Sequence, residues 1–177
     1  MTARKSILVG AVVVVVAVAW YLFRPEALIT STTVNEPFPA MEQSAPAMAE
    51  SPSMASSTMA PDVPAKIVTG RFHSNAHETN GLATIYRFPD GRRVLRLTEF
   101  ATSNGPDVRV YLVAAGDVQD EDAAKQAGFV DLGALKGNIG DQNYDVPANL
   151  DLTKYRAVSI WCRRFSVNFG AAPLVES

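Results

Sequence analysis

The chain has 177 residues, a formal net charge of −2 and one cysteine, Cys162. A single cysteine excludes a disulfide within the chain and a zinc site built from several cysteines. The charge is uneven: residues 1–25 carry +3, residues 26–64 carry −5, and the remainder is neutral with 13 basic and 13 acidic residues. Because nucleic-acid binding needs a clustered basic face, this balance argues against a nucleic-acid partner.

Residues 7–23 form an uncharged apolar run, ILVGAVVVVVAVAWYLF. As a helix this run spans roughly 25 Å, near the lower limit for crossing a bilayer. Arg4 and Lys5 precede the run, so the positive-inside rule predicts a cytoplasmic N-terminus and an extracytoplasmic C-terminal part. The pattern predicts a transmembrane signal anchor over residues 1–24, and through it a single-pass membrane protein with the membrane as a partner.

A cleaved signal peptide is the competing interpretation of the same run. Ala17-Val18-Ala19 has the small-residue pattern of a cleavage site. The apolar run continues through Trp20-Tyr21-Leu22-Phe23, which favours retention, and aromatic rings at that end suit a membrane interface. Whether the anchor is cleaved stays open, but both interpretations export the rest of the chain to the periplasm or the cell exterior.

Residues 25–64 are rich in Pro, Ala, Ser, Thr, Met and Glu and show no apolar periodicity. Such a composition buries too little apolar surface to offset the entropy cost of ordering. It predicts a disordered acidic linker between the anchor and a domain at residues 65–177. As a flexible coil, 40 residues would have an end-to-end distance of about 35 Å.

From Ala65 onward, short apolar runs alternate with Gly, Asp, Asn and Pro, which is typical of an all-β antiparallel sandwich. Pro89-Asp90-Gly91 predicts a hairpin turn. Val108, Val110 and Leu112 share one face, so we expect strands with one buried and one wet face. The expected strands are 66–72, 82–88, 94–100, 108–114, 129–132, 144–146, 157–162, 165–169 and 174–175.

Two segments depart from the simple strand pattern. Residues 117–128 are polar and contain several alanines, which predicts a loop with a short helix ended by Gly128. In residues 157–170 the apolar positions are even up to Cys162 and odd from Phe165 onward. Because a strand has a period of two, this change of phase predicts a bulge or strand break at residues 162–164.

Four motifs resemble a known family, the DM-thirteen domain, an electron-transfer module. They are Gly70-Arg71-Phe72 with His77 and Gly81, LRLTEF with NGPDVRVYL in residues 95–112, DLGALKGNIGDQNY at 131–144, and SIWCRRFSVNFG at 159–170. The resemblance covers residues 66–175. It implies an extracytoplasmic β-sandwich similar in kind to haem-binding DOMON domains, with a role in redox modification at cell surfaces. It further implies that Cys162 acts as a naked thiol or as a ligand to a prosthetic group.

A redox role makes Cys162 the first candidate, with His77, His73 and Asp107 as secondary candidates. Neither His nor Met follows Cys162, which argues against a blue-copper arrangement, and the chain lacks the C-x-x-C-H motif of c-type haem. Non-covalent haem held by His77 or Cys162 stays open, copper is less favoured, and the sequence leaves any metal unknown. Arg163 and Arg164 flank the cysteine, and cations favour a thiolate.

A rival interpretation belongs to another class of protein. In it the sandwich is a cell-surface binding or structural module, and Cys162 is a buried and inert core residue. The spacings predict no catalytic triad and no carboxylate pair, so we expect electron transfer or binding without catalytic turnover by the domain itself. The redox or cell-surface partner, the electron donor and the acceptor are not specified by the sequence.

Overall fold

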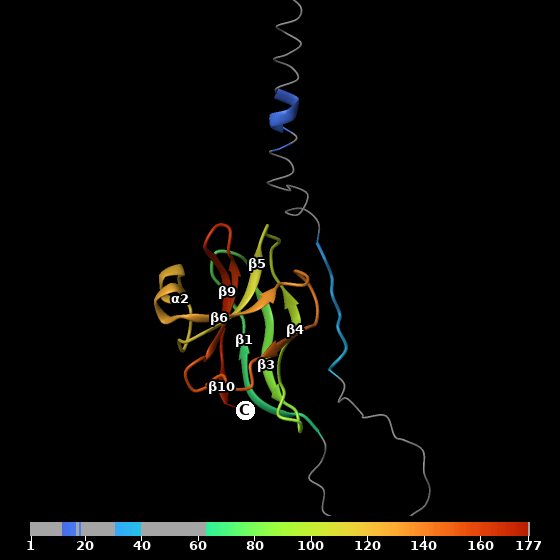
Figure 1. The fold of residues 1–177 in the computed structure, drawn as a ribbon, viewed down its shortest axis with the longest axis vertical. Helices are drawn as coiled ribbons and strands as arrows, with labels where there is room; N and C mark the ends of the chain where they lie inside the picture. The colour runs from blue at the N-terminus through green and yellow to red at the C-terminus, as the bar shows by residue number, and fades with distance from the viewer. Residues whose placement is uncertain (1–11, 17, 19–30, 40–62, 177) are drawn as a thin grey trace, which may run out of the picture.

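The computed structural model describes residues 12–16, 18, 31–39 and 63–176. Within these residues the chain forms two five-stranded antiparallel sheets packed face to face, as Figure 1 shows. The prediction of an all-β sandwich is confirmed. The strands are β1 (Ala65–Arg71), β2 (His73–Ser74), β3 (Asn80–Arg87), β4 (Arg93–Ala101), β5 (Val108–Val113), β6 (Phe129–Ala134), β7 (Gln142–Val146), β8 (Ala157–Cys162), β9 (Val167–Pro173) and β10 (Val175–Glu176).

The first sheet has the strand order β10-β1-β3-β4-β7. Its β3–β4 hairpin turns at Asp90 and Gly91, as the sequence predicts, and Gly91 has a φ of 86° that a residue with a side chain rarely adopts. Leu95 and Leu97 of β4 are fully buried against the second sheet, while Arg96 between them faces outward. This sheet therefore follows the expected alternation of buried and wet faces.

The second sheet has the order β2-β9-β8-β5-β6 and departs from that alternation. All six residues of β8 are buried, as are five of the six residues of β5. The expectation of one wet face is wrong here, because residues 114–128 cross the outer face and cover it. This excursion contains α2 (Glu121–Ala127), which begins after the N-cap Asp120 and ends at Gly128, as the sequence predicts.

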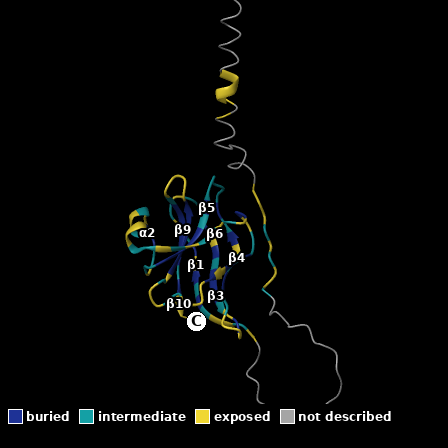
Figure 2. Cartoon of the chain, viewed as in Figure 1, coloured by how far each residue is buried: buried dark blue, intermediate teal, exposed yellow. Residues whose placement is uncertain are grey.

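Two hydrophobic clusters result from this arrangement. The inner core lies between the sheets and includes Ile85, Leu95, Val110, Ile160 and Cys162. A smaller outer cluster lies between the second sheet and the excursion. Figure 2 shows that the buried residues are concentrated in the strands, whereas the turns are exposed. The outer cluster is formed by Tyr111, Val113, Val118, Ala124, Ala157, Trp161 and Ala171.

The predicted break after Cys162 is confirmed as the turn of the β8–β9 hairpin. Residues 163–166 form this turn, and Ser166 has a φ of 55°. The hairpin also contains a register shift between Ile160 and Trp161. The second strand begins at Val167, so the expected start at Phe165 is wrong, because that side chain is 58% exposed at the tip of the turn.

Residues 31–39 lie in extended conformation against the first sheet, and we call this segment the strap. Composition placed it in the linker, but Thr32, Val34 and Glu36 make backbone hydrogen bonds with residues 139–141. A Cβ at Gly140 would collide with the carbonyl oxygen of Val34, so glycine leaves room for the strap. Figure 1 shows the strap descending beside β4.

Glu36 and Phe38 make the side-chain contacts of the strap. The Lys136 ammonium lies 2.7 and 2.9 Å from the two Glu36 carboxylate oxygens, and the Asn143 amide donates to Glu36 at 2.7 Å. The Phe38 ring packs edge-on against Tyr86 at 5.0 Å between centroids. Burial tends to raise the pKa of Glu36, but the bonds from Lys136 and Asn143 outweigh it and lower that pKa.

The predicted membrane-spanning run, residues 7–23, lies largely outside the described residues. Within this run the structure describes residues 12–16 and 18, and these are helical. Within the described part of the chain, no helix has the length and apolar character needed to cross a membrane.

Candidate functional site

Three loops meet at the end of the sandwich where Cys162 lies. They are residues 75–79, residues 102–107 and the β8–β9 turn. The hydroxyls of Thr79 and Thr102 are 2.9 Å apart and buried. The backbone amides of residues 75–77 donate to the carbonyls of Asn168 and Phe169. We call this region the cysteine end, and it collects His77, Asp107 and Cys162 from distant positions in the sequence.

Cys162 is the last residue of β8 and is 1% exposed. Its partners across the strands are Val108 and Val167, and its side chain belongs to the inner core. Trp161 belongs to the outer cluster, because adjacent residues of a strand point to opposite faces. Cys162 is therefore not packed under Trp161 but faces the interior between the two sheets.

Asp107 and Arg163 close the cysteine end with two hydrogen bonds. The Arg163 backbone amide donates to the Asp107 carbonyl at 2.9 Å, and the Arg163 Nε donates to the Asp107 carboxylate at 2.8 Å. The ion pair balances the charge of the arginine that the sequence placed beside the thiol. In this geometry Asp107 stabilises the β8–β9 turn by accepting both hydrogen bonds, and its carboxylate offsets the charge of Arg163.

His77 lies on the outside of the cysteine end. Its ring centroid is 4.0 Å from that of Phe169, an inner-core residue. A Cβ at Gly105 would lie 2.7 Å from Val108 and 3.0 Å from Phe169, so the 102–107 loop packs closely over the same residues. Phe169 and Val108 thus separate the histidine and this loop from the interior that holds Cys162.

His73 belongs to a different place from His77. It lies on β2, and its Nε2 is 2.8 Å from a carboxylate oxygen of Asp117 in the excursion. Burial tends to raise the pKa of Asp117, but the bonds from His73 and the Val118 amide outweigh it and lower that pKa. The spacing of four between the histidines therefore does not produce a shared ligand site.

A buried polar chain joins the second sheet to the excursion, and the sequence analysis missed it. The Ser159 hydroxyl donates to the Asn168 side-chain oxygen at 2.9 Å, and Asn168 donates to the Val118 carbonyl at 3.1 Å. Asn75 donates to the same carbonyl at 2.8 Å. Asn168 is fully buried, and an asparagine within the apolar run Val167–Gly170 was the available signal.

A row of aromatic rings crosses the outer face of the second sheet beside α2. Tyr111 stacks on Phe129 at 4.3 Å and lies 6.3 Å from Trp161. Burial raises the pKa of Tyr111, with Asp131 adding to the effect. Tyr111 and Trp161 are 3% and 5% exposed, and Phe129 is 46% exposed at the rim of the row.

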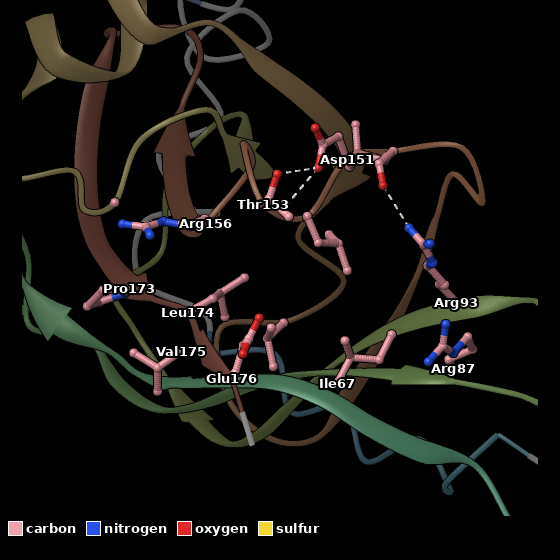
Figure 3. A pocket seen from close by; sticks show the side chains of 14 residues that line it. Ile67, Arg87, Arg93, Asp151, Thr153, Arg156, Pro173, Leu174, Val175 and Glu176 are labelled. Atoms are coloured by element: carbon pink, nitrogen blue, oxygen red, sulfur yellow. Dashed lines mark hydrogen bonds between the residues drawn. The ribbon is translucent and has the colours of Figure 1, made fainter.

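A cleft of about 700 Å³ lies at the opposite end of the sandwich. Figure 3 shows Arg93, which donates to the Leu150 carbonyl at 2.7 Å, beside Arg87, with Arg156 on the other side of the cleft. None of the predicted site residues lines it. Its walls are completed by Ile67, Val68, Gly116, Leu150, Asp151, Leu152, Thr153, Pro173, Leu174, Val175 and Glu176.

The predicted ligand residues do not come together as a metal site in this arrangement. Among the described residues, no group of three His, Cys, Asp or Glu side chains could hold a metal ion. His73 is paired with Asp117, Asp107 is paired with Arg163, and Cys162 lies in an apolar interior.

A comparison with protein families covers most of the domain. A family model described as Electron transfer DM13 matches residues 71–174. The chain belongs to this family. The resemblance to the DM-thirteen domain is thereby confirmed, and the matched region contains the second sheet, most of the first sheet and Cys162. No curated protein and no solved structure matches the chain.

Proposed function

We propose that this chain is a membrane-anchored, extracytoplasmic DM-thirteen protein that takes part in electron transfer, with Cys162 as its redox group. Residues 1–24 act as a single-pass anchor with a cytoplasmic N-terminus, residues 25–64 as a linker whose residues 31–39 dock on the domain, and residues 65–177 as the working domain. The observation that carries the redox role is the Electron transfer DM13 match over residues 71–174.

The position of Cys162 limits how it works as a thiol. With no second cysteine in the chain, Cys162 can form a disulfide only with a partner protein. Its thiolate would attack the disulfide of the partner, forming a mixed disulfide while the second partner sulfur leaves as a thiolate and takes up the proton that Cys162 has lost. The thiol is 1% exposed, so direct attack requires the cysteine end to open. The β8–β9 turn and the 102–107 loop, joined by the Asp107 and Arg163 pair, are the elements that would separate.

A binding or structural module with an inert thiol is the second candidate. It is favoured by one specific observation, the full burial of Cys162 among apolar residues of the inner core. A free cysteine in such a place behaves as a small hydrophobic residue. This candidate also needs no opening of the cysteine end. The reactivity of the thiol in the folded protein separates the two candidates.

The test compares native and denatured full-length chain in detergent. We expect the native Cys162 thiol to react with a maleimide slowly but measurably, and Asp107→Asn to accelerate the reaction by freeing the turn. Asp90→Asn is the matched control, because it weakens the pair with Arg92 in the β3–β4 turn, at the opposite end of the sandwich. A native thiol that reacts only after global unfolding, in both variants, would assign Cys162 to the core and favour the second candidate.

Cofactor binding is tested separately by absorption spectra after incubation with haem or with Cu(I). His77→Ala and Cys162→Ser are the informative variants, and His73→Ala is the control because its ring is paired with Asp117. From the geometry we expect no absorption band that depends on His77 or Cys162. A band lost in either variant but kept in His73→Ala would replace the thiol mechanism with a cofactor mechanism.

Membrane attachment is tested by alkaline extraction and external protease treatment of cell membranes. The proposed topology predicts that the chain stays in the membrane pellet and that the domain is accessible only from the extracytoplasmic side. Release by alkali would contradict the anchor, and cleavage from the cytoplasmic side would contradict the orientation.

A further inference from the structure

The strap fixes where the chain enters the domain. Thr32 donates its backbone amide to the Asn138 side chain at 2.7 Å and accepts from the Ile139 amide at 3.3 Å. Asn138 in turn donates to the Thr102 carbonyl at 3.1 Å, and the Thr102 amide donates to the Asn138 carbonyl at 2.8 Å. Thr102 opens the 102–107 loop, so the strap starts at the cysteine end.

The strap also shortens the tether to the membrane. If residues 7–23 span the bilayer, as the proposed function holds, only residues 24–30 separate the apolar run from the strap. Seven residues reach at most about 25 Å even when fully extended. A flexible linker of 40 residues would instead allow many orientations at about 35 Å. The docked strap therefore keeps the cysteine end turned toward the membrane and close to it.

The surface of the cysteine end has features that suit a lipid headgroup layer. Phe165 is 58% exposed at the tip of the β8–β9 turn, and Ile139 beside the strap is 38% exposed. Arg163 and Arg164 precede the phenylalanine in the same turn, and Arg163 shares its charge with Asp107. An aromatic ring flanked by arginines is favourable at a membrane interface, where the ring enters the apolar boundary and guanidinium groups meet anionic headgroups.

We propose that the cysteine end rests on the lipid surface of the chain's own membrane, with Phe165 entering the headgroup region. The partner is an anionic phospholipid surface, and the strap holds the domain in this orientation. Figure 1 shows the start of the strap and the β8–β9 turn at the same end of the sandwich, and β10 at the other end. Electron exchange through Cys162 would then take place at the membrane surface.

The test places one nitroxide label on the full-length chain in nanodiscs of phosphatidylcholine and phosphatidylglycerol in equal parts. In a Cys162→Ser background, Phe165→Cys is compared with Val175→Cys, which is 62% exposed at the opposite end. Dissolved oxygen concentrates in lipid, whereas a nickel chelate stays in water. We expect the label at 165 to be several-fold less accessible to nickel and more accessible to oxygen than the label at 175.

Release of the strap supplies the second arm of the test. Phe38→Ala combined with Lys136→Gln removes its ring contact and its ion pair. We expect the label at 165 to approach the nickel accessibility of the label at 175, with the circular dichroism of the domain unchanged. Equal accessibility at 165 and 175 before release, in chains that resist alkaline extraction, would overturn this inference alone. Chains released by alkali would instead refute the anchor of the proposed function.

Discussion

The two sheets are both covered on their outer faces, but by segments of different chemistry. The excursion over the second sheet buries Val118 completely and Ala124 to 2% exposure, and it is bonded to the fully buried Asn168. The strap over the first sheet leaves Phe38 42% exposed and is held by backbone hydrogen bonds with residues 139–141 and by the Glu36 and Lys136 pair. Apolar burial makes the excursion part of the fold. The strap can detach more easily, because a half-exposed ion pair stabilises it only weakly.

The largest expected effect comes from removing the centre of the outer cluster. Trp161→Ala should lower the free energy of unfolding by about 3–5 kcal/mol, because it empties a buried aromatic position between β8 and α2. Urea denaturation of the detergent-solubilised chain measures the loss. Phe129→Ala, at the exposed rim of the same aromatic row, should cost clearly less. Equal losses would show that the excursion is not held by buried apolar area.

The buried polar chain provides the next effect. Asn168→Ala leaves the buried Ser159 hydroxyl without its acceptor and removes one of the two donors to the Val118 carbonyl, so it should cost about 1–3 kcal/mol. Hydrogen exchange at residues 117–128 should accelerate more than exchange in β4. Ser159→Ala removes only the hydroxyl at the end of the chain and should cost less. Faster exchange confined to the first sheet would contradict this assignment.

A smaller effect is expected when the strap loses its ion pair. Lys136→Gln should change the free energy of unfolding by only about 0–1 kcal/mol, as is usual for partly exposed pairs. Exchange of the Val34 and Glu36 amides should nevertheless increase. Arg109→Gln, which breaks the pair with Asp131 away from the strap, is the matched control and should leave these two amides unchanged. A large loss of global stability in Lys136→Gln alone would show that the strap is part of the folding unit.

The smallest effect is a pH response of the strap. The pKa of Glu36 is lowered from its ordinary value of 4.5, so the ionised carboxylate favours docking. This stabilisation is complete above the ordinary pKa and is lost as the pH falls through the lowered value. Exchange of the Glu36 amide, corrected for its intrinsic pH dependence, should therefore increase as the pH falls below 4.5 and through the lowered pKa. Glu36→Gln should abolish the response.

Acid also affects the excursion, because the pKa of Asp117 is lowered from its ordinary value of 3.8. The two covers can be separated by comparing exchange at Val118 with exchange at Glu36. The apolar contacts of Val118 and Ala124 do not titrate, so the excursion should stay docked at a pH that already frees the strap. If exchange at Val118 and at Glu36 increased at the same pH, the excursion and the strap would not differ in how firmly they are held.

The comparison also shows which parts of the fold local patterns can predict. The β3–β4 turn at Asp90-Gly91, the helix ended by Gly128 and the break after Cys162 depend on residues close in sequence. Each of these predictions is confirmed. The wet face expected for the second sheet is wrong, because its cover comes from residues 114–128, and pairing between distant segments has no local signature.

The candidate site, like the fold, could be predicted only in part from the sequence. The sequence singled out Cys162 and the motif that contains it, but not the side of the strand or the depth at which the thiol lies. The separation of His73 from His77 followed from the contacts of His73 with Asp117 and of His77 with Phe169. Neither contact could be predicted, because each joins residues from different parts of the chain.

By itself the sequence determined the all-β class, the family and the main turns, because periodicity, turn residues and ordered motifs are local properties of the chain. Only the tertiary structure decided that residues 31–39 dock on the domain. A segment of Pro, Thr, Glu and Phe cannot stabilise itself, so it is ordered only where Lys136, Asn143 and Tyr86 meet it. The burial of Cys162 was decided in the same way, by the packing of two sheets that close over it.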